Sequence, residues 1–246
     1  QLRHQRHRQE VLRSGIRYIR AEILGGDIQI QQGNIFDDIS INDRYDAVFA
    51  NYPLGLRARN TGSIGEEYVR RLVDRKPEYA KLSSMDWVFN RKAYDCVGGP
   101  GRVICIMANG STWNTIDKRV RRSFLEDGLV EMVIALPSRI YDGMGVATSM
   151  IVFSHGNTRT MMVDATEACE KGRRMNVITD DYISRILEAC EHESSISRFV
   201  DYMEIEQNDY NLSPGVYLDP QEEEIENGVE LGSLVTITRG AQVQAS

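Results

Sequence analysis

The residues whose types and spacing could do chemistry lie at the end of one apolar run, in the segment "YDAVFANYPLGLR" at residues 45–57. An apolar strand ends there at Asn51, which is followed by Tyr52, Pro53 and Leu54. Pro53 has no N–H and cannot continue a sheet ladder, so the chain must turn out at this point. In α/β sheets, ligands bind outside the carboxyl ends of the strands. The segment therefore predicts either a ligand-binding strand end or, since Asn and Pro are common in loops, an ordinary turn.

The elements that must position Asn51 alternate along the chain between helix and strand. Apolar residues at helical spacing predict helices over residues 12–23, 85–97, 116–128 and 180–191, the last with an Asp N-cap. Alternating or continuous apolar runs predict strands over residues 27–34, 46–51, 102–107, 129–136 and 148–154. Strands that alternate with helices are typical of an α/β fold around a mostly parallel sheet.

The composition limits the classes of protein to be considered. At 246 residues, the chain is long enough for one large domain or for one domain with an appendage. No window reaches the roughly eighteen apolar residues of a membrane span, and the N-terminus lacks the apolar region of a signal peptide. Four cysteines without a CxxC pair indicate free thiols in a reducing cytoplasm. The four histidines have no ligand spacing, so no metal site is expected.

Charge is unevenly distributed along the chain. Residues 201–230 hold ten acidic residues and no Lys or Arg, whereas the rest of the chain holds 29 basic against 26 acidic residues. One basic cluster falls in the predicted helix 116–128, at Lys118, Arg119, Arg121 and Arg122. Such a cluster either contacts nucleic-acid phosphates or forms an outward, solvated helix face, and charge alone does not decide between the two.

Four segments resemble one protein family. "YDAVFANYPLG" resembles the "FDxVxANPPF" segment of DNA adenine-N6 methyltransferases. Three further segments are similar to the modification (M) subunit of type I restriction–modification systems: "GGPGRVICIMANGSTW", "VRRSFLEDGLVEMVIALPSRIYDGMGVATSMIVFS" and "NDYNLSPGVYL". The resemblance covers about residues 8–220, in the family's order. It implies a Rossmann-like S-adenosylmethionine-dependent methyltransferase fold with the sheet order 3-2-1-4-5-7-6, of which this chain is expected to carry strand 3 and strands 4 to 7.

The resemblance also implies a role for each residue of the opening segment. The N6 amino group of adenine is a poor nucleophile because its lone pair is delocalised into the ring. In the family, an Asn side-chain oxygen and the next backbone carbonyl accept hydrogen bonds from this amino group and aim its lone pair at the methyl donor. These acceptors correspond to Asn51 and Tyr52, while Pro53 stiffens the loop and Leu54 occupies the place of an aromatic ring that stacks on the flipped base. Asn34, in "GNIF", matches the residue that holds the adenine of S-adenosylmethionine.

Two departures from the family pattern predict weakened catalysis. Tyr52 replaces the first proline of NPPF, which loosens the backbone. Leu54 replaces the aromatic residue, and base–aromatic stacking contributes roughly 1–3 kcal/mol. The Tyr52 ring is one candidate to stack in its place.

The family's glycine-rich cofactor loop has no match, because "ILGGD" at residues 23–27 follows a helix and precedes a strand. The fold is therefore expected to be incomplete at its N-terminal, cofactor-loop side, with weak S-adenosylmethionine binding by this chain alone.

Two functions remain open from the sequence. The first is a DNA adenine-N6 methyltransferase subunit, or a fragment of one, that modifies a flipped adenine in double-stranded DNA. The second is a catalytically impaired methyltransferase-like module for DNA clamping or complex assembly. The expected partners are a specificity (S) subunit or domain and, in addition, a restriction (R) subunit. The expected organisation is a methyltransferase domain at 1–200, an acidic segment at 201–230 and the start of a specificity-type domain or linker at 231–246.

Overall fold

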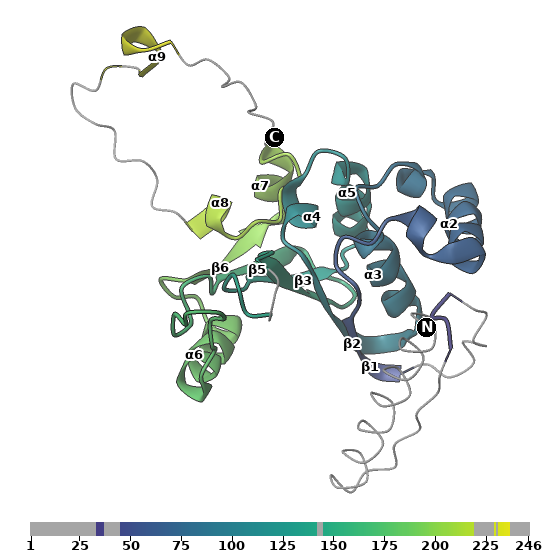
Figure 1. Ribbon diagram of the computed structural model, residues 1–246, viewed down its shortest axis with the longest axis horizontal. Helices are drawn as coiled ribbons and strands as arrows, with labels where there is room; N and C mark the ends of the chain where they lie inside the picture. Colours follow the sequence, from purple (N-terminus) through teal and green to yellow (C-terminus); the bar gives the residue numbers. More distant parts are fainter. Residues whose placement is uncertain (1–32, 37–44, 142–144, 219–228, 230, 237–246) are drawn as a thin grey trace, which may run out of the picture.

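The computed structural model describes residues 33–36, 45–141, 145–218, 229 and 231–236, and its centre is a six-stranded sheet (Figure 1). The strand order is β1-β2-β4-β3-β5-β6. The strands are β1 (Tyr45–Asn51), β2 (Val97–Ala108), β3 (Val130–Ala135), β4 (Thr148–Phe153), β5 (Arg159–Asp164) and β6 (Ser197–Asp201). The predicted helix at 12–23 and most of the predicted strand at 27–34 lie outside the described residues.

The sheet is mixed, so the prediction of a mostly parallel sheet was wrong. β1 pairs with β2, and β3 with β5, in parallel, whereas β4 is antiparallel to both of its neighbours and β6 is antiparallel to β5. A parallel neighbour requires a crossover, usually a helix, and the described part of the β3–β4 connection contains none. β4 therefore returns directly and inserts between β2 and β3. The resulting order β1-β2-β4-β3 has the 4-5-7-6 arrangement that the family resemblance implied.

Helices pack on both faces of the sheet, with α3 and α5 on one face and α6 on the other. The longer ones are α2 (Gly62–Arg75), α3 (Asp86–Asp95), α5 (Lys118–Glu126) and α6 (Asp180–Glu191). The short ones are η1 (Ala58–Asn60), η2 (Pro77–Ala80), α4 (Gly110–Trp113), α7 (Tyr202–Gln207), α8 (Gly215–Leu218) and α9 (Leu231–Leu234). Figure 1 shows α2, α3 and α5 grouped beside β1 and β2, with α6 near β5 and β6. None of the described helices is long and apolar enough to cross a membrane.

The three predicted helices that fall in the described residues are present, with two corrections at their ends. The helix predicted from residue 116 begins at Lys118, and Ile116 before it is exposed. The N-cap of α6 is Thr179, not Asp180, and it makes no side-chain capping hydrogen bond. Asp180 and Asp181 lie instead in the first turn of α6, where a negative charge favours the helix dipole.

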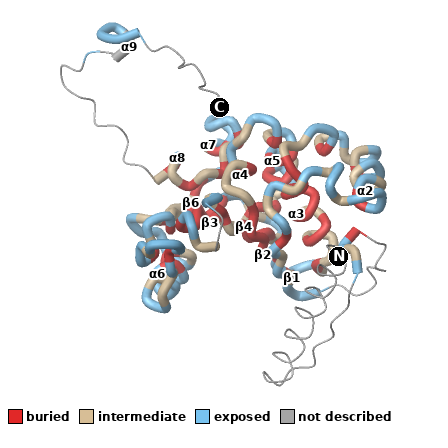
Figure 2. Tube along the Cα trace, in the orientation of Figure 1, coloured by how far each residue is buried: buried red, intermediate tan, exposed pale blue. Residues whose placement is uncertain are grey.

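The main core lies between α3, α5 and the sheet, where buried residues concentrate (Figure 2). Trp87 of α3 packs on Phe124 of α5 with ring centroids 5.1 Å apart, and Phe124 packs on Phe153 of β4 at the same distance. The same core cluster includes four residues from beyond position 200, namely Ile205, Tyr210, Leu212 and Tyr217. The predicted domain boundaries at 200 and 230 stay predictions.

β1 lies at the edge of the described sheet, and because the predicted strand at 27–34 falls mostly outside the described residues, the expectation that β1 is a central strand stays a prediction. Its side chains alternate, as in any strand. Val48 and Ala50 pack against the main core, whereas Phe49 is 65% exposed and Asn51 is also exposed. Among the described residues, the main core therefore covers one face of β1.

Candidate active site

The carboxyl ends of the parallel strands β1 and β2 and the amino end of the antiparallel strand β4 lie on the same side of the sheet. β1 and β2 are parallel, with Asn51 opposite Ile106, and β2 ends two residues later at Ala108. The antiparallel strand β4 begins opposite Ala108, at Thr148. Asn51 is exposed at this edge, and no side chain or backbone group in the described ranges hydrogen-bonds its amide. The amide is therefore available to a ligand.

Tyr52 turns the opposite way from Asn51, into the core. Its ring stacks on Phe89 of α3 with centroids 4.6 Å apart, and its hydroxyl donates a hydrogen bond to Asn90 Oδ1 over 2.7 Å. Burial raises the pKa of this phenol well above its ordinary value. The suggestion that Tyr52 could stack on a flipped base was therefore wrong, because its ring is already packed inside the protein.

Residues 53–56 form a turn that is hydrogen-bonded to the N-terminal end of α3. Pro53 is exposed and Leu54 is half-buried. Gly55 has φ +63°, a left-handed conformation that glycine adopts most readily. Its N–H points to Asp86 Oδ1 at 3.3 Å, and the carbonyl of Leu56 accepts a hydrogen bond from Met85 N at 2.7 Å. The backbone that follows Asn51 is therefore tied to the start of α3.

Asp86 is a site residue that the sequence analysis missed. Its side chain is fully buried, and its Oδ2 accepts hydrogen bonds from Ala108 N at 3.1 Å and from Ser111 Oγ at 3.0 Å. Burial raises the pKa of the Asp86 carboxyl, an effect that these hydrogen bonds partly oppose. An acidic residue inside the apolar stripe of the predicted helix 85–97 was the one sequence signal that could have revealed it.

Asn34 is connected to the Asn51 loop through a row of aromatic rings. Its Oδ1 accepts a hydrogen bond from Phe36 N at 3.0 Å. The buried Phe36 ring packs on Phe89 with centroids 5.1 Å apart, and the Phe89 ring also stacks on Tyr52. The amide nitrogen of Asn34 suits recognition of an adenine ring. Among the described residues, Asn34 is the one position that the family resemblance assigns to S-adenosylmethionine, at its adenine end.

A protein-family comparison decides the identity of this chain. The model of the family described as N-6 DNA methylase matches residues 17–226. The chain belongs to the N-6 DNA methylase family.

Individual relatives agree with this assignment. A type I restriction enzyme methylase subunit, MjaVII of Methanocaldococcus jannaschii, is 27% identical over 199 residues, which cover 72% of this chain. A second subunit from the same organism, MjaVIII, is 26% identical over 129 residues, covering 48% of this chain. The N-6 DNA methylase chain spans only 33% and 22% of the lengths of these two relatives.

Solved structures show the same fold. The type I methyltransferase subunit from Streptococcus thermophilus superposes with a TM-score of 0.66 at 22% identity, over 77% of this chain and 41% of that one. The EcoKI M protein superposes with a TM-score of 0.53 at 16% identity, over 77% of this chain and 46% of that one. The Rossmann-like methyltransferase fold expected from the sequence is therefore confirmed.

The basic helix α5 of this N-6 DNA methylase is largely committed to internal contacts. Arg121 is buried, contrary to both alternatives for this helix, and its Nε donates to the carbonyl of Tyr210 at 2.8 Å. Lys118 pairs with Asp209, and Arg122 pairs with Glu126 at 2.7 Å. Of these four basic residues, Arg119 and Arg122 are exposed, and of these two only Arg119 has no ion pair with the described residues. Burial lowers the pKa of Arg121 to about 10, so the guanidinium still carries its charge at neutral pH.

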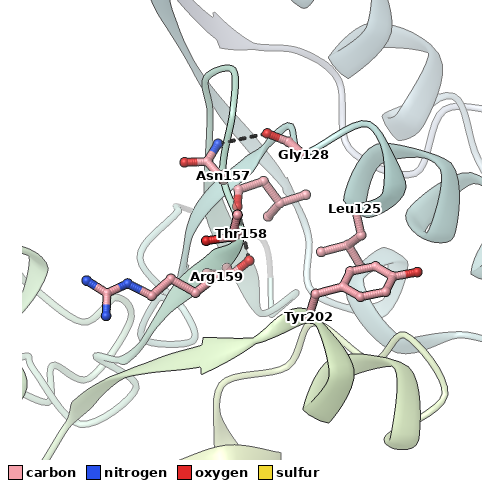
Figure 3. Close-up of a pocket in the computed structure, with 8 residues that line it drawn as sticks. Leu125, Gly128, Asn157, Thr158, Arg159 and Tyr202 are labelled. Atoms are coloured by element: carbon pink, nitrogen blue, oxygen red, sulfur yellow. Dashed lines mark hydrogen bonds between the residues drawn. The ribbon is translucent and has the colours of Figure 1, made fainter.

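A small pocket of the N-6 DNA methylase lies at the other edge of the sheet (Figure 3). It is lined by the first residues of β3 and β5 and by Leu125, Asn157 and Tyr202. The Asn157 amide is already used there, because its Nδ2 donates to the carbonyl of Gly128 at 3.0 Å. This pocket therefore belongs to a turn that joins strand starts, and it is separate from the strand end at Asn51.

Proposed function

We propose that this chain is the target-base part of a DNA adenine-N6 methyltransferase, the modification subunit of a type I restriction–modification system. The observation that carries the proposal is the exposed Asn51, with its amide unengaged, at the carboxyl end of β1 in a member of the N-6 DNA methylase family. The proposed reaction transfers a methyl group to a flipped adenine in duplex DNA. S-adenosylmethionine would supply that methyl group, and the DNA substrate would place the protein in the cytoplasm.

Asn51 and Tyr52 would act on the adenine amino group as hydrogen-bond acceptors. The Asn51 side-chain oxygen and the Tyr52 backbone carbonyl would each accept one N6 hydrogen, which favours a pyramidal nitrogen with a localised lone pair. Acceptors fixed in place before the reaction need no reorganisation as charge develops, and this is the main source of their effect. The exposed Pro53 would restrict the backbone after these two acceptors. The Asn51 side chain and the Tyr52 carbonyl are therefore proposed to orient and polarise the amino group.

A second candidate function is a methyltransferase-like module for DNA clamping or assembly. It is favoured by the absence of a stacking ring in the segment 51–54, where Tyr52 is buried and Leu54 is aliphatic. Without that ring, a flipped base loses roughly 1–3 kcal/mol of stacking. Under either function, the partners would be duplex DNA, a specificity subunit and a restriction subunit.

A turn at residues 172–175 offers the DNA backbone two arginines at the same edge as Asn51. The turn follows β5, whose carboxyl end lies beside that of β3 because the two strands are parallel. Arg173 and Arg174 are exposed, and in the described part of the chain neither guanidinium forms an ion pair. Duplex DNA bound at this edge could place its phosphates against them.

The turn is held rigidly. Arg139 Nη2 donates to the carbonyl of Arg173 at 2.7 Å, and Asn176 Nδ2 donates to the carbonyl of Ser138 at 2.9 Å. A Cβ on Gly172 would lie 2.0 Å from the Met175 carbonyl oxygen, so this position requires glycine. Two arginines on a fixed turn lose little backbone freedom on binding.

The proposed function is tested by methyl transfer in the complete reading frame that contains this chain, assembled with its specificity subunit. Incorporation of labelled methyl groups into unmodified duplex DNA is measured for the wild type and for Asn51→Ala. The expected result is loss of incorporation by Asn51→Ala with unchanged thermal unfolding, because a transition-state contact is removed from an exposed position. Asn60→Ala, an exposed asparagine in η1, serves as the matched control and should retain activity. Equal incorporation by wild type and Asn51→Ala would show that residues 51–54 form only a turn, and no incorporation by the wild type would favour the clamping module.

A further inference from the structure

The Asn51 loop is held by two polar side chains one turn apart on α3. Asp86 and Asn90 are four residues apart, so they lie on the same face of the helix. Asn90 Oδ1 accepts the Tyr52 hydroxyl at 2.7 Å, and Asp86 Oδ1 faces Gly55 N at 3.3 Å. The loop is therefore anchored on both sides of Pro53 and Leu54.

Asp86 also joins this loop to the end of β2. Its second oxygen accepts hydrogen bonds from Ala108 N and Ser111 Oγ, at the start of the next loop on the same edge. The donors to this buried carboxylate are neutral, and in the described residues no cation pairs with it. A buried carboxylate without a counter-charge is costly, and such groups concentrate at functional sites. A purely structural contact between two loops would not require a charged group.

We propose that Tyr52 and Asp86 are positioning residues that fix the direction of the Asn51 amide and of the Tyr52 carbonyl. This inference rests on the proposed methyltransferase function. In the NPPF pattern, a proline at the position of Tyr52 restricts one backbone angle. Here the Tyr52 ring, stacked on Phe89 and bonded to Asn90, restrains the same backbone from its side chain. The substitution of tyrosine for proline thereby replaces a local restraint by a tertiary one.

The burial of Tyr52 also sets the direction of the Asn51 side chain. Successive side chains in an extended segment point to opposite sides. A buried Tyr52 therefore directs the side chain of Asn51 away from α3, where the amide is exposed. Asp86 holds the next turn of the loop at Gly55, so the carbonyl of Tyr52 lies between two anchored points. Release of either anchor should let both acceptors rotate without unfolding the domain.

The test compares Tyr52→Phe and Asp86→Asn in the complete reading frame, assembled with its specificity subunit and supplied with duplex DNA. Single-turnover methyl transfer gives a rate constant for the bound complex and an amplitude for the fraction of active molecules. Loss of positioning lowers the rate constant, whereas a merely structural defect lowers the amplitude. We expect each variant to lower the rate constant about tenfold, with the amplitude and the KM for DNA unchanged.

Two matched controls remove similar groups elsewhere in the core. Tyr79→Phe removes the hydroxyl of another buried tyrosine, and Asp117→Asn alters another buried carboxylate. In the described part of the chain, no hydrogen bond joins either side chain to residues 51–56, and Asp117 bonds Ser83 and Asn114 instead. Both controls should keep the wild-type rate constant.

The outcomes separate this inference from the proposed function. A wild-type rate constant in both Tyr52→Phe and Asp86→Asn overturns the inference, as does a loss confined to the amplitude. If Asp86→Asn does not fold, Tyr52→Phe decides alone, because it removes one oxygen and keeps the stacked ring. If Asn51→Ala is as active as the wild type, the proposed role of Asn51 is overturned, and if the wild type itself transfers no methyl group, the proposed methyltransferase function is overturned.

Discussion

Asn51 and Tyr52 are consecutive residues, yet Asn51 is exposed at the sheet edge and the ring of Tyr52 is buried against Phe89. The loop therefore presents the acceptors that an amino group requires but no aromatic ring for a base. Leu54 is the remaining position from which a ring could act, and it is half-buried in the turn.

Leu54→Phe should raise methyl transfer if the missing ring limits the reaction. A ring at this position would recover stacking of roughly 1–3 kcal/mol, which corresponds to a gain of about fivefold to a hundredfold in the stability of the flipped state. The measurement is labelled-methyl incorporation, with Leu54→Met as a control of similar size and no ring. A gain of the same size in Leu54→Met would show that stacking is not the cause.

Arg173→Ala/Arg174→Ala should weaken duplex binding by the assembled complex at low salt. Each lost phosphate contact lowers the slope of log K against log salt concentration by about 0.9, so the double variant should lose about 2. The control is Arg102→Ala/Arg159→Ala, which removes two exposed arginines, one from the middle of β2 and one from the start of β5. Identical salt slopes for both double variants would rule out the turn as a DNA contact.

S-adenosylmethionine should bind weakly to the chain of residues 1–246 alone. Among the described residues, Asn34 is the one candidate for the adenine, and its side-chain oxygen already accepts the Phe36 N–H. Calorimetric titration is expected to give no saturation at micromolar ligand, whereas the complete reading frame should bind. A micromolar dissociation constant for this chain alone would contradict the prediction.

Asp86 should make the stability of the wild type fall as the pH rises. Burial raises the pKa of its carboxyl above the ordinary value of 3.8, so the folded state binds the proton more tightly than the unfolded state does. Its contribution to the free energy of unfolding is complete below that ordinary value and is lost as the pH rises through the raised pKa.

Asp86→Asn removes this titration. Relative to the wild type, the free energy of unfolding of the variant should increase between acidic and neutral pH. Urea unfolding at several pH values measures the difference, and Asp117→Asn provides the comparison at another buried carboxylate. If the difference in the free energy of unfolding between wild type and Asp86→Asn does not change with pH, the raised pKa of Asp86 is refuted.

Much of the fold could be predicted from apolar runs. Continuous runs gave the strands at 46–51, 102–107, 129–136 and 148–154, because a buried strand has few polar positions. β5 and β6 were missed because the segments "RTMMVD" and "SRFVD" are short and bounded by charges. Strand direction was also missed, since periodicity carries no information about whether neighbours run parallel or antiparallel.

The site was only partly predictable for a similar reason. The motif at residues 51–54 carries a sequence pattern, so its place at a strand end could be predicted. Asp86 could not be predicted, because it binds the backbone N–H groups of Gly55 and Ala108. Backbone N–H groups leave no pattern in a sequence, since almost every residue has one. The inward direction of Tyr52 depends on Phe89 and Asn90, which are close to it only in the folded chain.

The bonds from Arg121 to Tyr210 and from Leu212 N to the Thr112 carbonyl, 2.8 and 2.9 Å long, set an order of events during synthesis. The segment around α4 and α5 cannot complete its packing until Leu212 has left the ribosome, about 90 residues after Arg121. At typical translation rates of about 5–20 residues per second, this delay lasts roughly 5–20 s. During that interval Arg121 and the Thr112 carbonyl lack these partners, and the part of the core that Tyr210 and Leu212 complete stays open to solvent and to chaperones.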